Sequence, residues 1–467
     1  MKISKITTII IFILIIVTPL FMFNWEDGAV SKIDNRVLAE IPFMPNVPKG
    51  DLTESIEKCV EDRIGLRDKM ILYYTILNDK LFGKMVHPSY SYGKEGYVFF
   101  KMGPNMRYGE FHETFADMVK KIQDYCYERN IVFLFVFNPS KTSVLTKYLP
   151  AGVSYDSNWV NQFLSALDKR NVNYVDNTGL LIEKSNNGEI VFNKQYDAGH
   201  WTDTGAYYGV NSMLEGLREQ IPQIHINKKD EFRTTEKTMT SLPVSEFPIY
   251  EVIEEMNMKI TVQDNTVQYD NEVKRDNRYR GFSYSINLSR LEENGPKALV
   301  FQGSYMNGKG NKFLKNSLGE YVAVHNYQNV INFPYYFNIF KPQCVIFEVT
   351  EYTFSDGYFN RKDMENMKLT PPLSSEINKD NVIIKRDKIN NEDLSIEQGK
   401  ALTKIIWKNT FKEALYVWLL LSEDEFDMQK IPNTIKYEVS VKNESYNKLK
   451  EKLKIIVKYD SEFIVYE

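Results

Sequence analysis

The loop Asp197-Ala198-Gly199-His200-Trp201-Thr202 places an acidic residue and a histidine three positions apart, and it leads into a predicted helix. A carboxylate at this spacing can orient an imidazole and leave the other ring nitrogen facing a substrate. His200 would then act as a base, and Asp197 would hold its tautomer and stabilise the imidazolium. Taken alone, the loop also fits a solvated turn or a capping Asp. The site that it predicts still lacks a nucleophile.

Ser304 is the candidate nucleophile. The apolar run Ala298 to Phe301 continues into Gln302-Gly303-Ser304-Tyr305. A serine on the tight turn that leaves a buried strand can expose its hydroxyl at the carboxyl edge of a sheet, where backbone N–H groups can receive an oxyanion. A Gly-Ser pair after a strand is also an ordinary turn, and the local sequence is not a G-x-S-x-G elbow.

Three more residues are candidates for substrate binding: Trp201, Tyr305 and Lys141. Trp201 could stack on a sugar or pack beneath its loop. Lys141 follows a predicted strand and could bind an anionic sugar or pair with a carboxylate. Glu348 and Glu351 follow a later strand and receive no chemical role. Because the sequence has no glycine-rich phosphate loop and no zinc-type spacing, we predict no metal and no cofactor.

Composition narrows the class of protein. At 467 residues the chain is too long for one compact core of usual size, so we expect two or more units. Its formal net charge is −4, and its lysine runs are interleaved with Glu and apolar residues. This pattern lacks the basic patch that nucleic acid requires, so we predict no nucleic-acid partner.

Helix and strand patterns alternate through the middle of the chain. Phe111 to Glu128 has helical spacing, and the seven apolar residues from Ile131 to Phe137 are typical of a strand buried on both faces of a parallel sheet. A helix at Trp159 to Leu167 and a strand at Val172 to Val175 repeat the pattern. Later strand runs begin at Ala298 and Cys344. The alternation predicts an α/β fold with a parallel sheet.

The N-terminal region is predicted to span a membrane. Ile6 to Phe23 carries no charge, Lys2 and Lys5 precede it, and no small-residue cleavage site follows it. The charges predict a single-pass anchor in the cell membrane, with a cytoplasmic N-terminus and the remaining chain extracytoplasmic. The expected division of the chain is a transmembrane anchor at 1–24, a stalk and helical segment at 25–85, an α/β domain at 86–375 with a β-rich insertion at about 228–295, and a small β-rich unit at 376–467.

An ordered set of motifs runs from about residue 30 to residue 360. It comprises Asn35-Arg36-Val37-Leu38 with Pro42, Asp62 to Arg67, Phe82-Gly83, Gly93 to Phe99, Pro139-Ser140-Lys141 with Leu149-Pro150, the Asp197 to Thr202 loop before Gly205-Ala206, and Glu348 to Glu351. This order resembles the SGNH hydrolase-like proteins of the AlgJ/AlgX and DHHW type, which are related to alginate O-acetylation proteins and more distantly to DltD proteins.

The resemblance implies an SGNH-like three-layer fold with a Ser-His-Asp site on the extracytoplasmic side. Asp197 and His200 match the family's Asp-x-His-Trp motif with one extra residue between them. Ser304 matches the serine of its Gly-Asp-Ser element, which is here Gln302-Gly303-Ser304. The replacement of Gly-Asp-Ser by Gln302-Gly303-Ser304 changes the surroundings in which an oxyanion would be held.

We therefore expect a membrane-anchored O-acyltransferase, transferring an acetyl group to a cell-surface or secreted polysaccharide. The resemblance alone supports transfer over hydrolysis, and it implies an acyl donor delivered by a membrane-bound O-acyltransferase. Two alternatives stay open: a non-catalytic polysaccharide-binding or scaffold protein with a decayed site, and a carbohydrate esterase.

Overall fold

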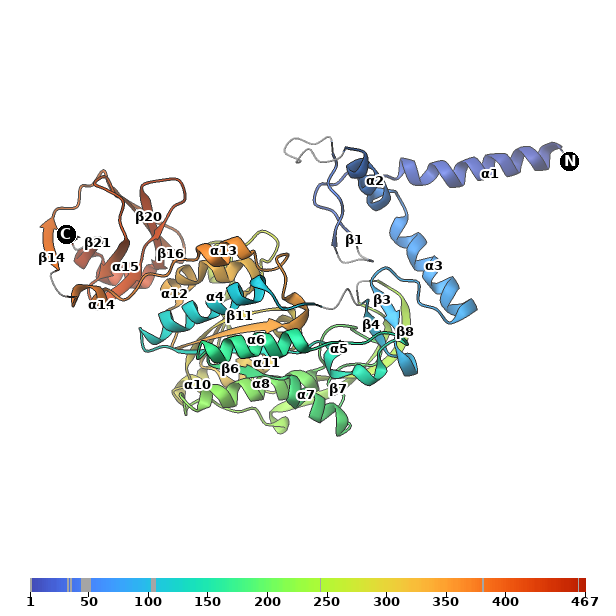
Figure 1. The fold of residues 1–467 in the computed structure, drawn as a ribbon, viewed down its shortest axis with the longest axis horizontal. Helices are drawn as coiled ribbons and strands as arrows, with labels where there is room; N and C mark the ends of the chain where they lie inside the picture. Colours follow the sequence, from blue (N-terminus) through green and yellow to red (C-terminus); the bar gives the residue numbers. More distant parts are fainter. Residues whose placement is uncertain are drawn as a thin grey trace.

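A seven-stranded sheet forms the centre of the protein (Figure 1). The computed structural model describes residues 2–31, 33, 36–42, 52–101, 106–243, 245–379, 382–460 and 462–467. The strand order is β6-β5-β13-β11-β12-β10-β9, and the first five strands are parallel. The strands are β5 (Val132–Asn138), β6 (Tyr174–Asp176), β9 (Gln263–Asp264), β10 (Phe282–Ile286), β11 (Lys297–Gln302), β12 (Glu320–His325) and β13 (Cys344–Thr350).

The continuous apolar runs form strands that are buried on both faces, as predicted. In β5, Phe133, Phe135 and Phe137 pack into one core, and Leu134 and Val136 pack into the other. Successive side chains of a strand point to opposite faces, so a strand covered on both sides needs apolar residues at every position. The α/β prediction is therefore confirmed for the five parallel strands, whereas β10 and β9 run antiparallel.

Helices cover both faces of the sheet and complete three layers (Figure 1). One face carries α4 (Glu110–Tyr127), α6 (Asn158–Lys169), α12 (Phe333–Phe340) and α13 (Arg361–Asn366), and the other carries α5 (Lys141–Val144), α7 (Thr178–Asn186), α8 (Asp203–Arg218) and α11 (Asn311–Ser317). The hydroxyl of Thr202 accepts a hydrogen bond from the Gly205 N–H at 3.0 Å and so caps α8. This cap ends the Asp197 to Thr202 loop at a defined point.

Two strands within the span of the expected insertion, β9 and β10, belong to the main sheet. β10 pairs antiparallel with β12, and β9 pairs with β10. Before them, β7 (Phe232–Ser241) and β8 (Pro248–Met258) form an antiparallel hairpin. Short apolar stretches among polar residues do not reveal which sheet a strand joins, because the pairing partner is far away in sequence.

The C-terminal residues form two further sheets, with strand orders β14-β22-β21-β17-β18 and β15-β16-β20-β19. Their strands are β14 (Ile383–Asp387), β15 (Leu394–Gln398), β16 (Leu402–Lys408), β17 (Tyr416–Leu421), β18 (Asp424–Asp427), β19 (Gln429–Lys430), β20 (Lys436–Lys442), β21 (Leu453–Tyr459) and β22 (Glu462–Tyr466), with α14 (Leu373–Ile377) before them and α15 (Asn443–Leu449) among them. A separate apolar core, which includes Leu419 and Val441, packs between these sheets. The boundaries of the predicted domains stay predictions.

The predicted transmembrane anchor is wrong. Among the described residues, no helix combines the length and the apolar character needed to cross a membrane. Helix α1 (Lys2–Phe21) ends two residues before the apolar run ends at Phe23, and its apolar part begins only after Lys5. The apolar stretch within the helix is therefore shorter than the roughly 20 residues of a typical span.

The segment after α1 is tied to α2 (Leu52–Arg63), which α3 (Arg67–Phe82) follows. The buried Arg63 guanidinium donates hydrogen bonds to the backbone carbonyls of Asn24, Glu26 and Ala39. Of the expected stalk, Lys32, Asp34, Asn35 and residues 43–50 lie outside the described residues, as does Asp51, the expected start of the first helical segment.

Candidate active site

The turn after β11 presents Ser304 at the carboxyl edge of the sheet. Gly303 donates its backbone N–H to Glu348 Oε2 at 2.7 Å, and Asn138 donates its side-chain amide to Glu348 Oε1 at 2.8 Å. Glu348 is fully buried in β13, between the strands that end at Asn138 and Gln302. This burial raises the pKa of Glu348. The carboxyl group therefore ties three strand ends together and holds the turn that carries Ser304.

His200 lies between Asp197 and Ser304. Its Nδ1 is 2.7 Å from Asp197 Oδ1, and its Nε2 is 2.9 Å from Ser304 Oγ. The backbone N–H of His200 also donates to Asp197 Oδ1 at 3.1 Å. The structure thus brings the three predicted residues into one hydrogen-bonded series, although Ser304 is 104 positions from His200. Their catalytic roles stay predictions.

The extra residue in the loop is accommodated by the backbone of Asp197. Its φ of 55° lies in the left-handed region, which Asp adopts more readily than most residues. This turn directs the carboxylate back onto both the N–H and the ring of His200. The two intervening residues therefore do not prevent the Asp–His contact.

The charges favour one tautomer of His200. Burial by itself raises the pKa of Asp197, but hydrogen bonds from His200 and the charge of Lys309 lower it overall. An ionised Asp197 accepts a hydrogen bond from Nδ1–H of His200, which leaves Nε2 without a proton and able to take the proton of the Ser304 hydroxyl. The arrangement can therefore activate a serine for attack on an acyl carbon.

Tyr352 is a site residue that the sequence reasoning missed. Its hydroxyl is 2.8 Å from Ser304 Oγ, and it lies in the turn Glu351–Thr353 that follows β13. The Tyr352 side chain is 37% exposed, but desolvation still raises its pKa above the ordinary value, so the hydroxyl keeps its proton at neutral pH. It can donate to Ser304 or to an oxyanion formed there. The sequence feature that could have identified Tyr352 as a site residue is its position next to Glu351, directly after a predicted strand.

The three predicted substrate-binding residues have other contacts. Trp201 and Tyr305 are fully buried; the Trp201 indole donates to the Tyr305 carbonyl at 3.0 Å, and the Tyr305 hydroxyl donates to the Gly199 carbonyl at 2.6 Å. Neither ring presents a face to solvent, so both pack beneath the His200 loop. The buried Lys141 ammonium donates to the carbonyls of Val98 and Lys194. Burial lowers the pKa of Lys141 to about 7.

A pocket of about 300 Å³ lies near this series, although Asp197, His200 and Ser304 do not line it. Tyr352 lines it, as do Ala198 and Gly199 from the His200 loop. The remaining lining residues are Phe100, Lys101, Met106, Ser140, Lys141, Thr142, Tyr155, Asp156, Trp159 and Glu351. A concave, largely apolar surface with a few polar groups beside a candidate nucleophile is a typical ligand site.

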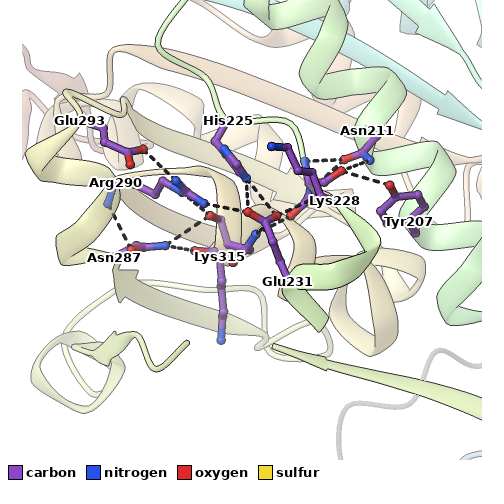
Figure 2. Close-up of polar contacts among 11 residues, drawn as sticks. Tyr207, Asn211, His225, Lys228, Glu231, Asn287, Arg290, Glu293 and Lys315 are labelled. Atoms are coloured by element: carbon purple, nitrogen blue, oxygen red, sulfur yellow. Dashed lines mark hydrogen bonds and ion pairs between the residues drawn. The ribbon is translucent and has the colours of Figure 1, made fainter. Parts of the chain in front are cut away.

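A second histidine–carboxylate pair lies elsewhere in the domain. His225 Nε2 contacts both oxygens of Glu231, at 2.7 and 3.0 Å, and Arg290 and the amide of Asn316 also contact that carboxylate (Figure 2). Lys228 donates its backbone N–H to the same group at 2.9 Å. No serine hydroxyl contacts this pair among the described residues. The pair joins the segment before β7 to α10 (Leu288–Glu292) and α11.

Residues 93–278 match the family model described as the SGNH hydrolase-like domain of the acetyltransferase AlgX. The resemblance predicted from the sequence is confirmed. This AlgX-type domain match includes Asp197 and His200 and ends before Ser304. No curated protein matches the chain. Within the described parts of the chain, no group of three or more His, Cys, Asp or Glu residues could hold a metal ion.

Several solved structures resemble this chain at low sequence identity. Bacillus cereus PatB1 with a sulfonyl adduct is 16% identical, with 60% of this chain and 97% of that chain covered and a TM-score of 0.44. The O-acetyltransferase domain of Pseudomonas putida AlgJ is 15% identical, with 60% and 100% covered and a TM-score of 0.42. Pseudomonas aeruginosa AlgX is 13% identical, with 76% and 87% covered and a TM-score of 0.40. These scores are too low to carry an argument about this chain.

Proposed function

We propose that this protein is an SGNH-like O-acyltransferase that acetylates a polysaccharide through Ser304, His200 and Asp197. One observation carries the proposal: Asp197, His200 and Ser304 form a continuous hydrogen-bonded series in a chain whose residues 93–278 match an acetyltransferase family model. The nearby pocket supports it, because Tyr352 lines that pocket and contacts Ser304, and a transferase needs room for an acceptor near its nucleophile.

In the first step, Ser304 Oγ attacks the carbonyl carbon of an acetyl ester or thioester. The serine proton moves to His200 Nε2, 2.9 Å away, and Asp197 stabilises the imidazolium. The tetrahedral oxyanion accepts a hydrogen bond from the Tyr352 hydroxyl. When the bond to the leaving group breaks, that group takes the proton from His200, and an acetyl-serine remains.

In the second step, a sugar hydroxyl attacks the acetyl-serine. His200 takes the proton of that hydroxyl, and the new carbon–oxygen bond forms as the bond to Ser304 breaks. The proton returns from His200 to Ser304 Oγ, so the site is restored. Attack by water in place of the sugar would make the protein an esterase.

The proposed partners follow from this chemistry. The acceptor is a polysaccharide hydroxyl, and the donor is an acetyl ester or thioester delivered by a membrane-bound O-acyltransferase on the extracytoplasmic side. The family resemblance supports this arrangement of donor and acceptor.

A serine-reactive phosphonate tests the nucleophile. We expect mass spectrometry of the treated protein to find one adduct on Ser304, and none there in Ser304→Ala. A wild-type protein with no adduct at Ser304 would overturn the assignment and favour a binding protein with a decayed site.

An acceptor experiment separates transfer from hydrolysis. With p-nitrophenyl acetate as donor, we expect an oligosaccharide acceptor to become acetylated and the acetyl-serine to decay faster in its presence. If acetate is released at the same rate with and without acceptor, and no sugar is acetylated, the protein is an esterase.

A further inference from the structure

Helix α3 turns an apolar face toward solvent. Residues three and four apart share one face of a helix. The exposed positions along this face, from the residue before the helix onward, are Leu66, Lys69, Met70, Tyr73, Tyr74, Leu77, Lys80 and Leu81. We call these residues the outer face of α3. Its apolar and aromatic members are each at least 37% exposed. A surface helix normally keeps its apolar stripe inside, so the pattern of α3 is inverted.

The opposite face of α3 packs on the rest of the protein. Leu72 and Ile76 lie against an apolar cluster that includes Ala198 of the His200 loop. Thr75, on the same side of the helix, is fully buried. Because these side chains are packed, α3 cannot turn about its axis to hide its apolar residues. The outer face therefore has a fixed direction.

The charges of α3 are divided between its two faces. Asp68 and Asp79 lie on the packed side, where each accepts a hydrogen bond from a hydroxyl group, at 3.0 and 2.9 Å. Lys69 and Lys80 are exposed on the outer face, which holds no acidic residue. The outer face is therefore both apolar and positively charged.

The exposed apolar surface continues from α3 onto the end of α1 (Figure 1). The Gly65 N–H donates to the Pro19 carbonyl at 2.9 Å, and a side chain on Gly65 would collide with Met22. The two helices therefore meet where the outer face begins. Phe21 and Trp25, close to this junction in the chain, are also exposed. Contiguous exposed apolar surface of this kind marks an interaction site.

The charge of the outer face decides between two kinds of partner. A second copy that paired through α3 or α1 would bring no carboxylate to the lysines, because neither the outer face nor α1 carries an acidic residue. An anionic lipid surface takes up apolar side chains at its headgroup boundary and attracts lysines, whose long stems let the ammonium groups reach the phosphates. Tyrosines, with an apolar ring and a polar hydroxyl, also suit this boundary. The outer face therefore fits a lipid surface better than a second copy.

We propose that the outer face of α3 docks the protein on an anionic lipid surface, with the helix lying along the surface. In this arrangement α3 occupies the headgroup region and does not cross the bilayer. Because its packed face adjoins the cluster that includes Ala198, docking holds the His200 loop at a fixed distance from the lipid. This inference does not depend on the proposed acyltransferase function, and its tests measure binding rather than acetyl transfer.

A fluorophore on the outer face tests contact with lipid. The native cysteines Cys59, Cys126 and Cys344 are buried, so a nitrobenzoxadiazole label attaches selectively to Leu77→Cys. The labelled full chain is mixed with vesicles of phosphatidylcholine, either alone or with about one quarter phosphatidylglycerol. We expect the emission to rise and shift to shorter wavelength with the anionic vesicles, because the label leaves water. The same label on Leu288→Cys in α10 should not respond.

Three results of this experiment would overturn the proposal. An unchanged emission at Leu77→Cys, while the protein still sediments with vesicles, would mean that another part of the chain binds lipid. An equal response to both kinds of vesicle would mean that the positive charge plays no part. An emission that rises with protein concentration in the absence of lipid would mean that a second copy covers the outer face.

Substitution of the two lysines measures the charged contribution. Lys69→Gln with Lys80→Gln should raise the lipid concentration for half-maximal binding roughly 30-fold, because each lysine is attracted to the anionic surface. Lys69→Arg with Lys80→Arg keeps both charges and should bind like wild type. Co-sedimentation with the anionic vesicles gives the lipid concentrations. Wild-type binding by the Gln pair would contradict the proposal.

Substitution of apolar residues measures the other contribution. Tyr73→Ser with Leu77→Ser should raise the half-maximal lipid concentration roughly 10-fold or more. Phe411→Ser with Leu415→Ser is the matched control, because these side chains are similarly exposed and belong to the C-terminal unit, at the other end of the molecule from α3 (Figure 1). The control should stay within about twofold of wild type. All four side chains are exposed, so urea midpoints should change little. Equal losses in the two pairs would show unspecific adhesion and overturn the proposal.

Discussion

Two histidine–carboxylate pairs lie near opposite ends of the parallel strands. His200 and Asp197 lie at the carboxyl end of β11, where Ser304 follows the strand. His225 and Glu231 lie near Arg290 and Asn316, residues that precede the starts of β11 and β12. The contact between ring nitrogen and carboxylate oxygen is 2.7 Å in both pairs.

The neighbours of each pair decide what it can do. His200 uses one nitrogen for Asp197 and directs the other at a hydroxyl beside a pocket. His225 uses a single nitrogen for both oxygens of Glu231, which also bonds Arg290 and Asn316 (Figure 2). A carboxylate surrounded by this many donors holds segments together, whereas a histidine between a carboxylate and a serine can move a proton. A histidine with a carboxylate partner is thus placed to move a proton in one site and to hold segments together in the other.

Replacing each histidine by alanine gives the largest expected contrast. We expect His200→Ala to lower acetyl transfer by about 10⁴-fold or more, because Ser304 loses its base. His225→Ala should leave the rate within about twofold and lower the free energy of unfolding by about 1–2 kcal/mol. Initial rates and urea midpoints of both variants measure the contrast. Equal rates for the two variants would remove the distinction between the pairs.

Replacing each carboxylate by its amide is the next test. Asn tolerates the left-handed backbone of Asp197, so Asp197→Asn should fold normally and lose about 10²- to 10⁴-fold in kcat through the wrong His200 tautomer. Glu231→Gln should keep its kcat and lose about 1.5–3 kcal/mol of stability, because hydrogen bonds to a charged group are lost. Loss of activity in Glu231→Gln without loss of stability would contradict this assignment.

Removing the Tyr352 hydroxyl tests a smaller contribution to catalysis at the His200–Asp197 pair. Tyr352→Phe keeps the ring but removes the hydrogen bond to Ser304 and to the developing oxyanion, so we expect kcat to fall about 10-fold. The urea midpoint should stay close to that of wild type. Tyr250→Phe on β8, where the ring is 76% exposed, serves as the control and should show wild-type kcat. An unchanged kcat in Tyr352→Phe would leave the tyrosine outside the mechanism.

The pH dependence of stability gives the smallest expected effect. Burial raises the pKa of Glu231, but the contacts with His225 and the Lys228 N–H outweigh it and hold the pKa below its ordinary 4.5. A carboxyl with a lowered folded pKa stabilises the fold above its unfolded pKa, and this contribution is lost as the pH falls through the folded value. The stability advantage of wild type over Glu231→Gln should therefore be full at pH 7 and shrink below about pH 4.5. An advantage that grows in acid would contradict the proposed charge state.

Local patterns were sufficient for the central layers of the fold. The seven apolar residues from Ile131 to Phe137 predicted a strand buried on both faces, and the loop that ends at Thr202 was predicted to lead into a helix, which is α8. Both patterns depend on neighbours within a few positions in the chain. The same reasoning failed for the predicted membrane anchor, because apolar composition alone did not show where α1 ends.

The sequence by itself indicated that Asp197 can reach His200, because only two residues separate them in the chain. Only the tertiary structure decided that Ser304 completes the series, that Tyr352 joins it and that Glu348 holds the serine turn. It also decided that Trp201 and Tyr305 are buried rather than exposed to a glycan. These contacts join the ends of parallel strands that are far apart in the chain, and only the packing of the sheet brings those ends together.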